Sequence, residues 1–360
     1  MKICKEPNSL VKIPSIQGLR AFAFLLIFIS HCSAYLEESH RGILSPLGGW
    51  GVSIFLILSG YLSAKFELFM ESLSFVSLMK LSYNKLKSRF KRVYALHVFT
   101  LLLALPFGYK VLFVDFKLGS CCSLFTNILL VQSWFPIGYF GYNSVSWYLS
   151  VFMFLSFVGI PLCYLYYTKE NVRRKSIYIC SILIVFQFVL CQIFKEASYA
   201  HWIIYIFPLT RLMDFVIGIS LFYSVNNSNS PHSGNVYLLS AFLLGFGNCY
   251  FAYGNKSEFF SVALCSVPTC FLIAGIMSNV KVVDFLFGNK LMVWIGNISF
   301  ELFLFHQLVV RYVHVVAKKL GFPPNCLTFI AIVFFCVVLS CSWQYLYLKI
   351  MAYKTKDKTA

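Results

Sequence analysis

Two residues that could bind a ligand or take part in catalysis, Arg20 and His31, lie inside a run of apolar residues near the start of the chain. His31 follows Arg20 by eleven positions, which at about 100° per residue is within roughly 20° of three full turns of an α-helix. Both side chains would therefore leave one helix face, about 16 Å apart. A guanidinium binds phosphate and an imidazole accepts a proton near neutral pH. Because ionisable groups within a membrane span are costly, both residues are functional candidates.

The composition indicates a membrane protein. Of the 360 residues, 59% are hydrophobic and only 12% are charged, which leaves too few charges to cover a soluble globule of this size. The 13 cysteines lie mostly in apolar runs and are interpreted as small buried hydrophobic residues. The net charge of +17 is interpreted as basic loops facing anionic lipid, and not as a nucleic-acid site.

Ten apolar runs are long enough to cross a bilayer, which takes about 17 to 25 residues each. They are residues 16–36, 48–66, 93–113, 145–167, 176–194, 202–224, 235–253, 259–278, 291–311 and 326–347. The segment from Cys121 to Trp134 is apolar but short. The predicted fold is therefore all-α, a polytopic integral membrane protein of about ten transmembrane helices.

The distribution of lysine and arginine predicts the orientation. With ten spans and a cytoplasmic amino end, most basic residues fall in cytoplasmic segments, as the positive-inside rule requires. An eleventh crossing at Cys121–Trp134 would remove most of this excess. We therefore expect both termini in the cytoplasm, with residues 346–360 forming a short basic tail and no fused soluble domain.

Six motifs occur in one order along the chain. The run Ile16–His31 resembles the opening of the membrane-bound acyltransferase-3 family, multi-span enzymes that O-acylate bacterial surface glycans. The motifs that follow in the family's order are Gly48–Leu62, Arg89–Tyr94, Ser146–Ser150 with Pro161, Arg211–Gly218 and Ile295–His306. The resemblance covers residues 13–345, which we expect to form one transmembrane domain. In one departure, Val151–Met153 carries no carboxylate, although many family members have one shortly after the tryptophan of this helix.

The resemblance and the predicted topology together suggest roles for these residues. The resemblance implies acetyl-CoA as donor, and Arg20, Arg89 and Arg92 lie at cytoplasmic helix ends where its phosphates would arrive. The predicted catalytic residues are His31, Arg20 and His306: His31 is the general base, and His306, at similar depth, flanks the same cavity as a supporting or acceptor-orienting residue. We also expect Arg20 and His31 to open onto a common polar channel. Predicted substrate or structural support comes from Ser59, Trp147, Arg211, Asp214 and Glu301.

Each of these residues also has a purely structural interpretation. Arg20 could snorkel to the membrane surface, and His31 could bond a neighbouring helix. Arg89 and Arg92 lie in a basic loop that could contact lipid. The remaining alternatives are an Arg211–Asp214 ion pair, helix packing at Ser59–Gly60, an interfacial role for Trp147 and a structural partner for Glu301. The other five histidines, His201 among them, match no motif and are interpreted as structural.

The sequence therefore predicts a multi-pass O-acyltransferase of the bacterial inner (cytoplasmic) membrane. It would transfer an acyl group, acetyl in the first instance, from acetyl-CoA to a sugar hydroxyl of a cell-surface polysaccharide such as O-antigen, capsule or exopolysaccharide. The expected partners are membrane lipid and a surface or lipid-linked glycan, with no metal and no nucleic acid. The alternative is a transporter or flippase of a lipid-linked glycan, which would move its substrate without consuming coenzyme. The membrane face on which the acceptor reacts does not follow from the sequence.

Overall fold

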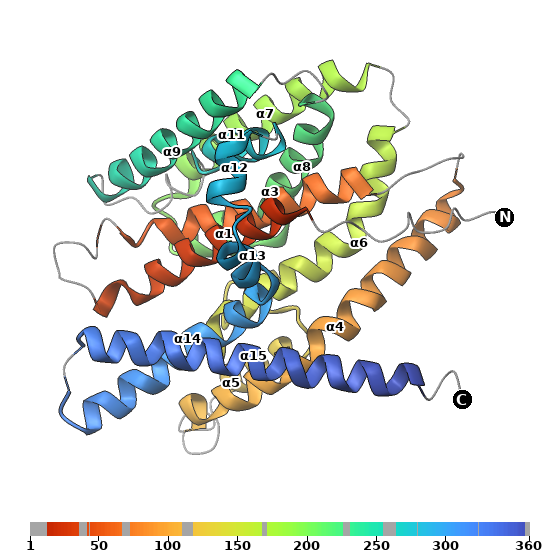
Figure 1. Cartoon of the computed structure of the whole chain (residues 1–360). Coiled ribbons are helices and arrows are strands. Elements are labelled where there is room, and N and C mark those ends of the chain that lie inside the picture. Colours follow the sequence, from red (N-terminus) through yellow and green to blue (C-terminus); the bar gives the residue numbers. More distant parts are fainter. Residues whose placement is uncertain are drawn as a thin grey trace.

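The computed structural model describes residues 13–35, 42, 44–66, 73–109, 118–167, 171–225, 231–254, 264–278, 280–322 and 324–356. Helices and turns make up this part of the chain, and it contains no strand (Figure 1). Nine of its helices are long and apolar enough to cross a membrane. The predicted all-helical, polytopic fold is confirmed.

Eight of these nine spans each contain one α-helix labelled in Figure 1, which in the span Ser144–Tyr167 follows the short 3-10 helix η4 (Ser144–Ser146). These helices are α1 (Pro14–Cys32), α3 (Leu47–Phe66), α4 (Phe75–Tyr109), α6 (Trp147–Tyr167), α7 (Val172–Phe194), α9 (Pro231–Gly254), α14 (Ser299–Lys319) and α15 (Cys326–Lys356). The ninth contains α8 (Pro208–Ser224) together with the π-helical segment η5 (Trp202–Ile206) before it. Shorter helices are α5 (Leu118–Ile128), α11 (Ser266–Met277), α12 (Lys281–Leu286) and α13 (Lys290–Asn297).

Two predicted boundaries are wrong, and a third lies partly outside the described residues. The basic segment before the third span is not a loop, because α4 is helical from Phe75 onward. The predicted span 291–311 is divided at Ile298 into α13 and α14, and the membrane-crossing part is Ser299–Lys319. In the predicted span 259–278, α11 has only 12 described residues, and residues 259–263 lie outside the described part. The doubtful segment at Cys121 forms α5, whose 11 residues reach about 16 Å and cannot cross a core of about 30 Å.

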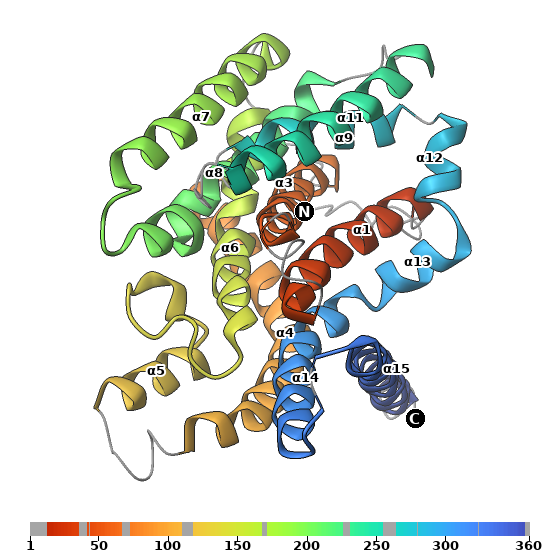
Figure 2. The same ribbon diagram turned by 90° about the vertical axis from the view of Figure 1, so that its left-hand side faces the viewer.

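Helices pack on both sides of α1 and α3. In Figures 1 and 2, α7, α9 and α11 lie on one side of α1 and α3, while α14 and α15 lie on the other. α1 packs against α3, α13 and α14, and α3 packs against α8. The α3–α8 contact is close because Gly60 lacks a side chain: a Cβ there would lie 1.9 Å from the carbonyl oxygen of Phe215. Gly60 therefore does serve helix packing.

Candidate active site

A cavity of about 440 Å³, here called the basic cavity, lies between α1, α3, α4, α6 and α14. Its cations are Arg20 of α1 and Lys85, Arg89 and Arg92 of α4. The three α4 positions are spaced i, i+4 and i+7, which places their side chains on one helix face. The apolar part of the wall comprises Phe55, Leu58, Leu62, Phe152, Phe300 and Phe303. The basic cavity thus offers cations for phosphate groups and an apolar wall for an uncharged chain.

The surroundings of these cations differ from one to the next. The guanidinium of Arg89 lies 4.8 Å from the ring centroid of Phe152 and donates to Ser156 Oγ at 3.3 Å. Phe152 belongs to the segment that lacks a carboxylate, so an aromatic face contacts Arg89 there in place of an acid. Glu301, in the first turn of α14, lies within electrostatic reach of Arg20 and Arg92.

The two motif histidines are in direct contact, although 275 positions separate them. His31 Nδ1 lies 2.7 Å from His306 Nε2, and the two rings are stacked with centroids 5.0 Å apart. His31 lies in the last turn of α1, and His306 lies two turns into α14. The shared depth predicted for the pair agrees with this contact. The contact forms although α14 begins later than the predicted span. The predicted depth of His306 was therefore right, but the predicted start of its helix was wrong.

Hydrogen bonds fix the proton positions of the neutral pair. His306 Nδ1 lies 2.7 Å from the carbonyl oxygen of Phe303 and 3.2 Å from that of Leu302. Because carbonyl oxygens only accept, His306 Nδ1 carries the proton and His306 Nε2 is an acceptor. His31 Nδ1–H must then donate to His306. The lone pair of His31 Nε2 remains, and this nitrogen is the one that can accept a proton from a substrate.

A second cavity of about 340 Å³, here called the histidine cavity, opens beside His31 at the other end of α1. Its walls come from α1, α3, α6, α14, the segment before α6 and the segment around η5. The lining side chains with rings or polar groups are His31, Phe140, Ser144, Trp147, His201, Tyr205, Phe303 and Gln307. Trp147 is only 4% exposed, so it belongs to this interior wall and not to an interfacial belt.

Phe303 separates the two cavities and lines both. Its ring contacts Tyr148 at a centroid distance of 5.3 Å and His306 at 5.9 Å. We predicted that Arg20 and His31 open onto one polar channel, but the described residues form two cavities instead. Arg20 lines the basic cavity and His31 the histidine cavity, and Phe303 is the residue that the two linings share.

Comparison with known proteins identifies the chain's relatives. The model of an acyltransferase domain, Acyl_transf_3, matches residues 13–345. The chain belongs to the acyltransferase-3 family. It is 29% identical over 341 residues to acyltransferase MdmB of Streptomyces mycarofaciens, covering 88% of this chain and 84% of that protein. No solved structure matches the chain. The protein is thus a multi-pass membrane acyltransferase, as the motifs predicted.

Within this acyltransferase-3 protein, the predicted site residues fall into four places. Arg20, Ser59, Arg89 and Arg92 line the basic cavity, and His31 and Trp147 line the histidine cavity. His306 is fully buried behind His31, and Glu301 lies near the arginines. Arg211 and Asp214 line neither cavity and form a buried ion pair of 2.7 Å. The catalytic and binding roles themselves stay predictions.

Several cavity residues escaped the sequence argument. His201 has no motif, yet it lines the same cavity as His31, and its ring lies 5.3 Å from that of Tyr205. Burial, and then the charge of Arg211, lower the pKa of His201 below its ordinary value, so this imidazole is neutral at pH 7. Phe303 could have been found, because it precedes His306 by three positions and thus shares its helix face.

Proposed function

We propose that this protein transfers an acetyl group from acetyl-CoA to a sugar hydroxyl of a cell-surface polysaccharide, in the inner membrane of a bacterium. The observation that carries the proposal is that His31, in contact with His306, lines one cavity, and that the adjoining cavity, which shares Phe303 with it, is cationic. Family membership supports the enzyme over the alternative of a transporter or flippase.

The basic cavity suits the donor. Coenzyme A carries several phosphates on one end and an uncharged pantetheine arm on the other. Arg20, Lys85, Arg89 and Arg92 would hold the phosphates through charge-assisted hydrogen bonds. The apolar wall, including Phe152 and Phe303, would contact the arm that leads to the thioester.

The histidine pair suits the transfer step. The Nε2 lone pair of His31 would take the proton of the acceptor hydroxyl as its oxygen attacks the thioester carbonyl carbon. The carbon–sulfur bond then breaks, and the proton passes from His31 to the leaving thiolate, giving an ester and free coenzyme A. His306 acts through its hydrogen bond to His31, which fixes the tautomer and the ring orientation, much as the acid does in a Ser-His-Asp triad. General base catalysis of this kind contributes about 10²- to 10⁴-fold to the rate.

Coenzyme turnover in proteoliposomes tests the proposal. Wild-type protein, labelled acetyl-CoA and a glycan extract should give labelled, ester-linked acetyl groups on the glycan and free thiol in equal amounts. His31→Ala should abolish both while the protein remains in the membrane. Glycan movement across the bilayer without thiol release would support the flippase and contradict the proposal.

Coenzyme binding tests the donor cavity separately. Arg89→Ala and Arg92→Ala each remove a charge-assisted contact, worth about 1.5 to 3 kcal/mol, and should weaken binding by about tenfold or more. Lys91→Ala is the matched control, because Lys91 lies on the same helix, is exposed and lines neither cavity. Equal coenzyme affinities in all three variants would exclude the basic cavity as the site that binds the coenzyme.

A further inference from the structure

The histidine cavity has the walls of a site for one ring. Its volume of about 340 Å³ lies at the lower end of the range for small-molecule sites. The rings of Trp147 and Tyr205 lie 5.1 Å apart, and those of Phe140 and His201 also 5.1 Å apart. Aromatic faces of this kind pack against the C–H face of a sugar ring, while its hydroxyls need polar partners at the edge.

A polar partner is present in the same wall. The Oε1 atom of Gln307 is buried and has no hydrogen-bond partner among the described residues. Gln307 follows His306 directly on α14 and lines the histidine cavity together with His31. A buried acceptor left unpaired costs about 1 to 3 kcal/mol, and a ligand hydroxyl that donates to it would remove this cost.

The aromatic wall depends on the unusual backbone of η5. In an α-helix the carbonyl of Ile204 would accept from the backbone nitrogen of residue 208, but Pro208 has no N–H. The chain instead forms a π-helical turn, in which Phe207 N–H donates to the Trp202 carbonyl. This change leaves the carbonyls of Ile203 and Ile204 without helical partners.

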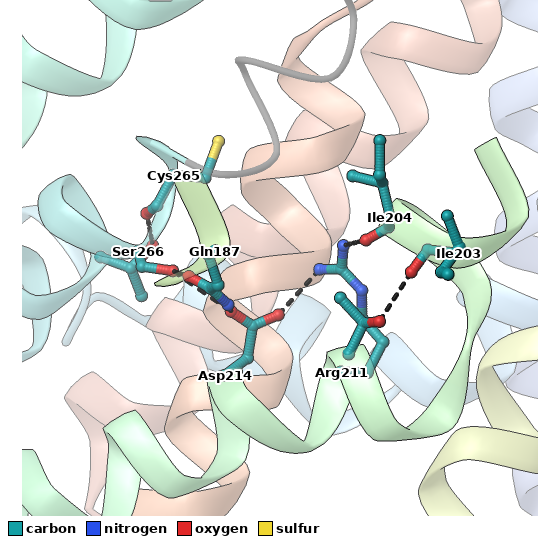
Figure 3. A network of polar contacts seen from close by, with 9 residues as sticks. Gln187, Ile203, Ile204, Arg211, Asp214, Cys265 and Ser266 are labelled. Carbon is teal, nitrogen blue, oxygen red and sulfur yellow. Dashed lines mark hydrogen bonds and ion pairs between the residues drawn. The ribbon is translucent and has the colours of Figure 1, made fainter. Parts of the chain in front are cut away.

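Two side chains of α8 supply the missing donors. Thr210 Oγ1 donates to the Ile203 carbonyl, and Arg211 Nη2 donates to that of Ile204, each at 2.6 Å. The Arg211 guanidinium also lies 5.1 Å from the ring centroid of Tyr205. Figure 3 shows Arg211 between the Ile204 carbonyl and Asp214. Arg211 thus connects the helix behind the cavity to the segment that forms its wall.

Asp214 makes this arrangement possible inside the membrane. Its carboxylate pairs with Arg211 and accepts from Gln187 Nε2 at 2.8 Å and from Ser266 Oγ at 3.2 Å (Figure 3). These contacts neutralise the charge of Arg211 and satisfy both carboxylate oxygens, which a buried ion pair requires. π-helical turns of this kind are often found at functional sites.

We propose that the histidine cavity binds one sugar ring of the acceptor, stacked on its aromatic wall with a hydroxyl on Gln307, and that the Arg211 network positions this wall. The inference deepens the proposed function and rests on it. It places donor and acceptor at opposite ends of α1, on either side of Phe303, so that the acceptor hydroxyl approaches His31 from the end remote from the coenzyme. Arg211 is on this account a positioning residue.

Ligand-induced change in tryptophan fluorescence tests binding directly, because Trp147 lies in the wall. The probes are the methyl glycosides of glucose, galactose and rhamnose, with sorbitol as an acyclic polyol control. At least one glycoside should change the emission of purified full-length protein saturably, sorbitol should not, and Trp147→Phe should remove the response. A response to none of the glycosides, or an equal response to sorbitol, would overturn the inference.

Two conservative variants separate this inference from the proposed function. Gln307→Met keeps the side-chain length but cannot accept a hydrogen bond from a sugar hydroxyl. Phe140→Leu removes one ring from a partly exposed position. Each should raise the KM for the acceptor about tenfold and leave coenzyme binding unchanged. Phe135→Leu is the matched control, because Phe135 is similarly exposed in the same segment but lines neither cavity.

The outcomes are distinct for the two claims. If wild-type protein transfers acetyl groups but Gln307→Met and Phe140→Leu match Phe135→Leu in acceptor KM, the acceptor site is wrong and the proposed function stands. If wild-type protein consumes no acetyl-CoA with any glycan, the proposed function itself fails. An Arg211→Lys variant adds a third test: it keeps the charge but loses the planar fork, and should raise the acceptor KM without changing the affinity for the coenzyme.

Discussion

Removing the hydrogen-bond acceptor that His306 offers to His31 gives the sharpest test of the histidine pair. In His306→Leu, the Nδ1–H of His31 loses its only described partner, the nitrogen 2.7 Å away, inside a buried site. A buried donor left unpaired costs about 1 to 3 kcal/mol. If His31 turns or changes tautomer to avoid this cost, its Nε2 is no longer held as the base. The expected fall in kcat is therefore about 5- to 150-fold.

The matched variant is His306→Gln, whose side-chain oxygen can accept from the same N–H. It should recover most of the lost rate, whereas a purely packing role for His306 predicts that Leu is tolerated at least as well as Gln. Single-turnover acetyl transfer with saturating acetyl-CoA measures the chemical step, and coenzyme affinity should be unchanged in both variants. A wild-type rate for His306→Leu, or equal rates for the two variants, would refute the tautomer argument.

Three further predictions concern other parts of the molecule. Phe152→Glu places a carboxylate beside Arg89, 4.8 Å from the present ring centroid, and should weaken acetyl-CoA binding about tenfold by competing with phosphate. Gly60→Ala should lower the melting temperature in detergent, because its Cβ would lie 1.9 Å from a backbone oxygen and overpacking costs about 1 to 3 kcal/mol. Because the folded protein holds the pKa of His201 below its unfolded value near 6.5, unfolding free energy should fall as pH drops below about 6.5.

Each of these predictions has its own control. Phe152→Gln, which adds a polar group without charge, should bind coenzyme more tightly than Phe152→Glu. Gly247→Ala adds a Cβ with nothing within 4 Å and should leave the melting temperature unchanged or slightly raised. His201→Gln cannot titrate, so its melting temperature should depend less on pH than that of the wild type. A pH dependence identical in both would show that His201 does not carry the effect.

Properties repeated along the chain were predictable from the sequence. Apolar runs gave the membrane class and most of the spans, because the length of a span is set by the bilayer and not by its neighbours. The i, i+11 relation between Arg20 and His31 placed one near each end of α1. Equal distance from the start of a span suggested that His31 and His306 share a depth, although the assumed start of the second span was wrong.

Features that depend on contacts distant in sequence could not be predicted. Helical periodicity shows which residues share a face but not which helix that face meets, so His201 gave no sign that it would line the same cavity as His31. The boundary of α4 was missed because its basic half is too polar for a span, although such residues form helices readily. That Phe303 would line two cavities, and not one channel, depended in the same way on contacts between distant helices. The π-helical turn did leave a trace, since Pro208 interrupts an otherwise continuous apolar run.

The position of Phe303 between the two cavities has a consequence for the membrane as a whole. A continuous aqueous path from the arginines to His31 would let protons and small ions run down any gradient that the bilayer maintains. One buried ring, held by Tyr148 and His306, interrupts such a path with hydrocarbon. The proposed transfer brings the thioester to the acceptor hydroxyl at His31, so it requires the ring of Phe303, which lines both cavities, to turn aside during turnover and to close the path again afterwards.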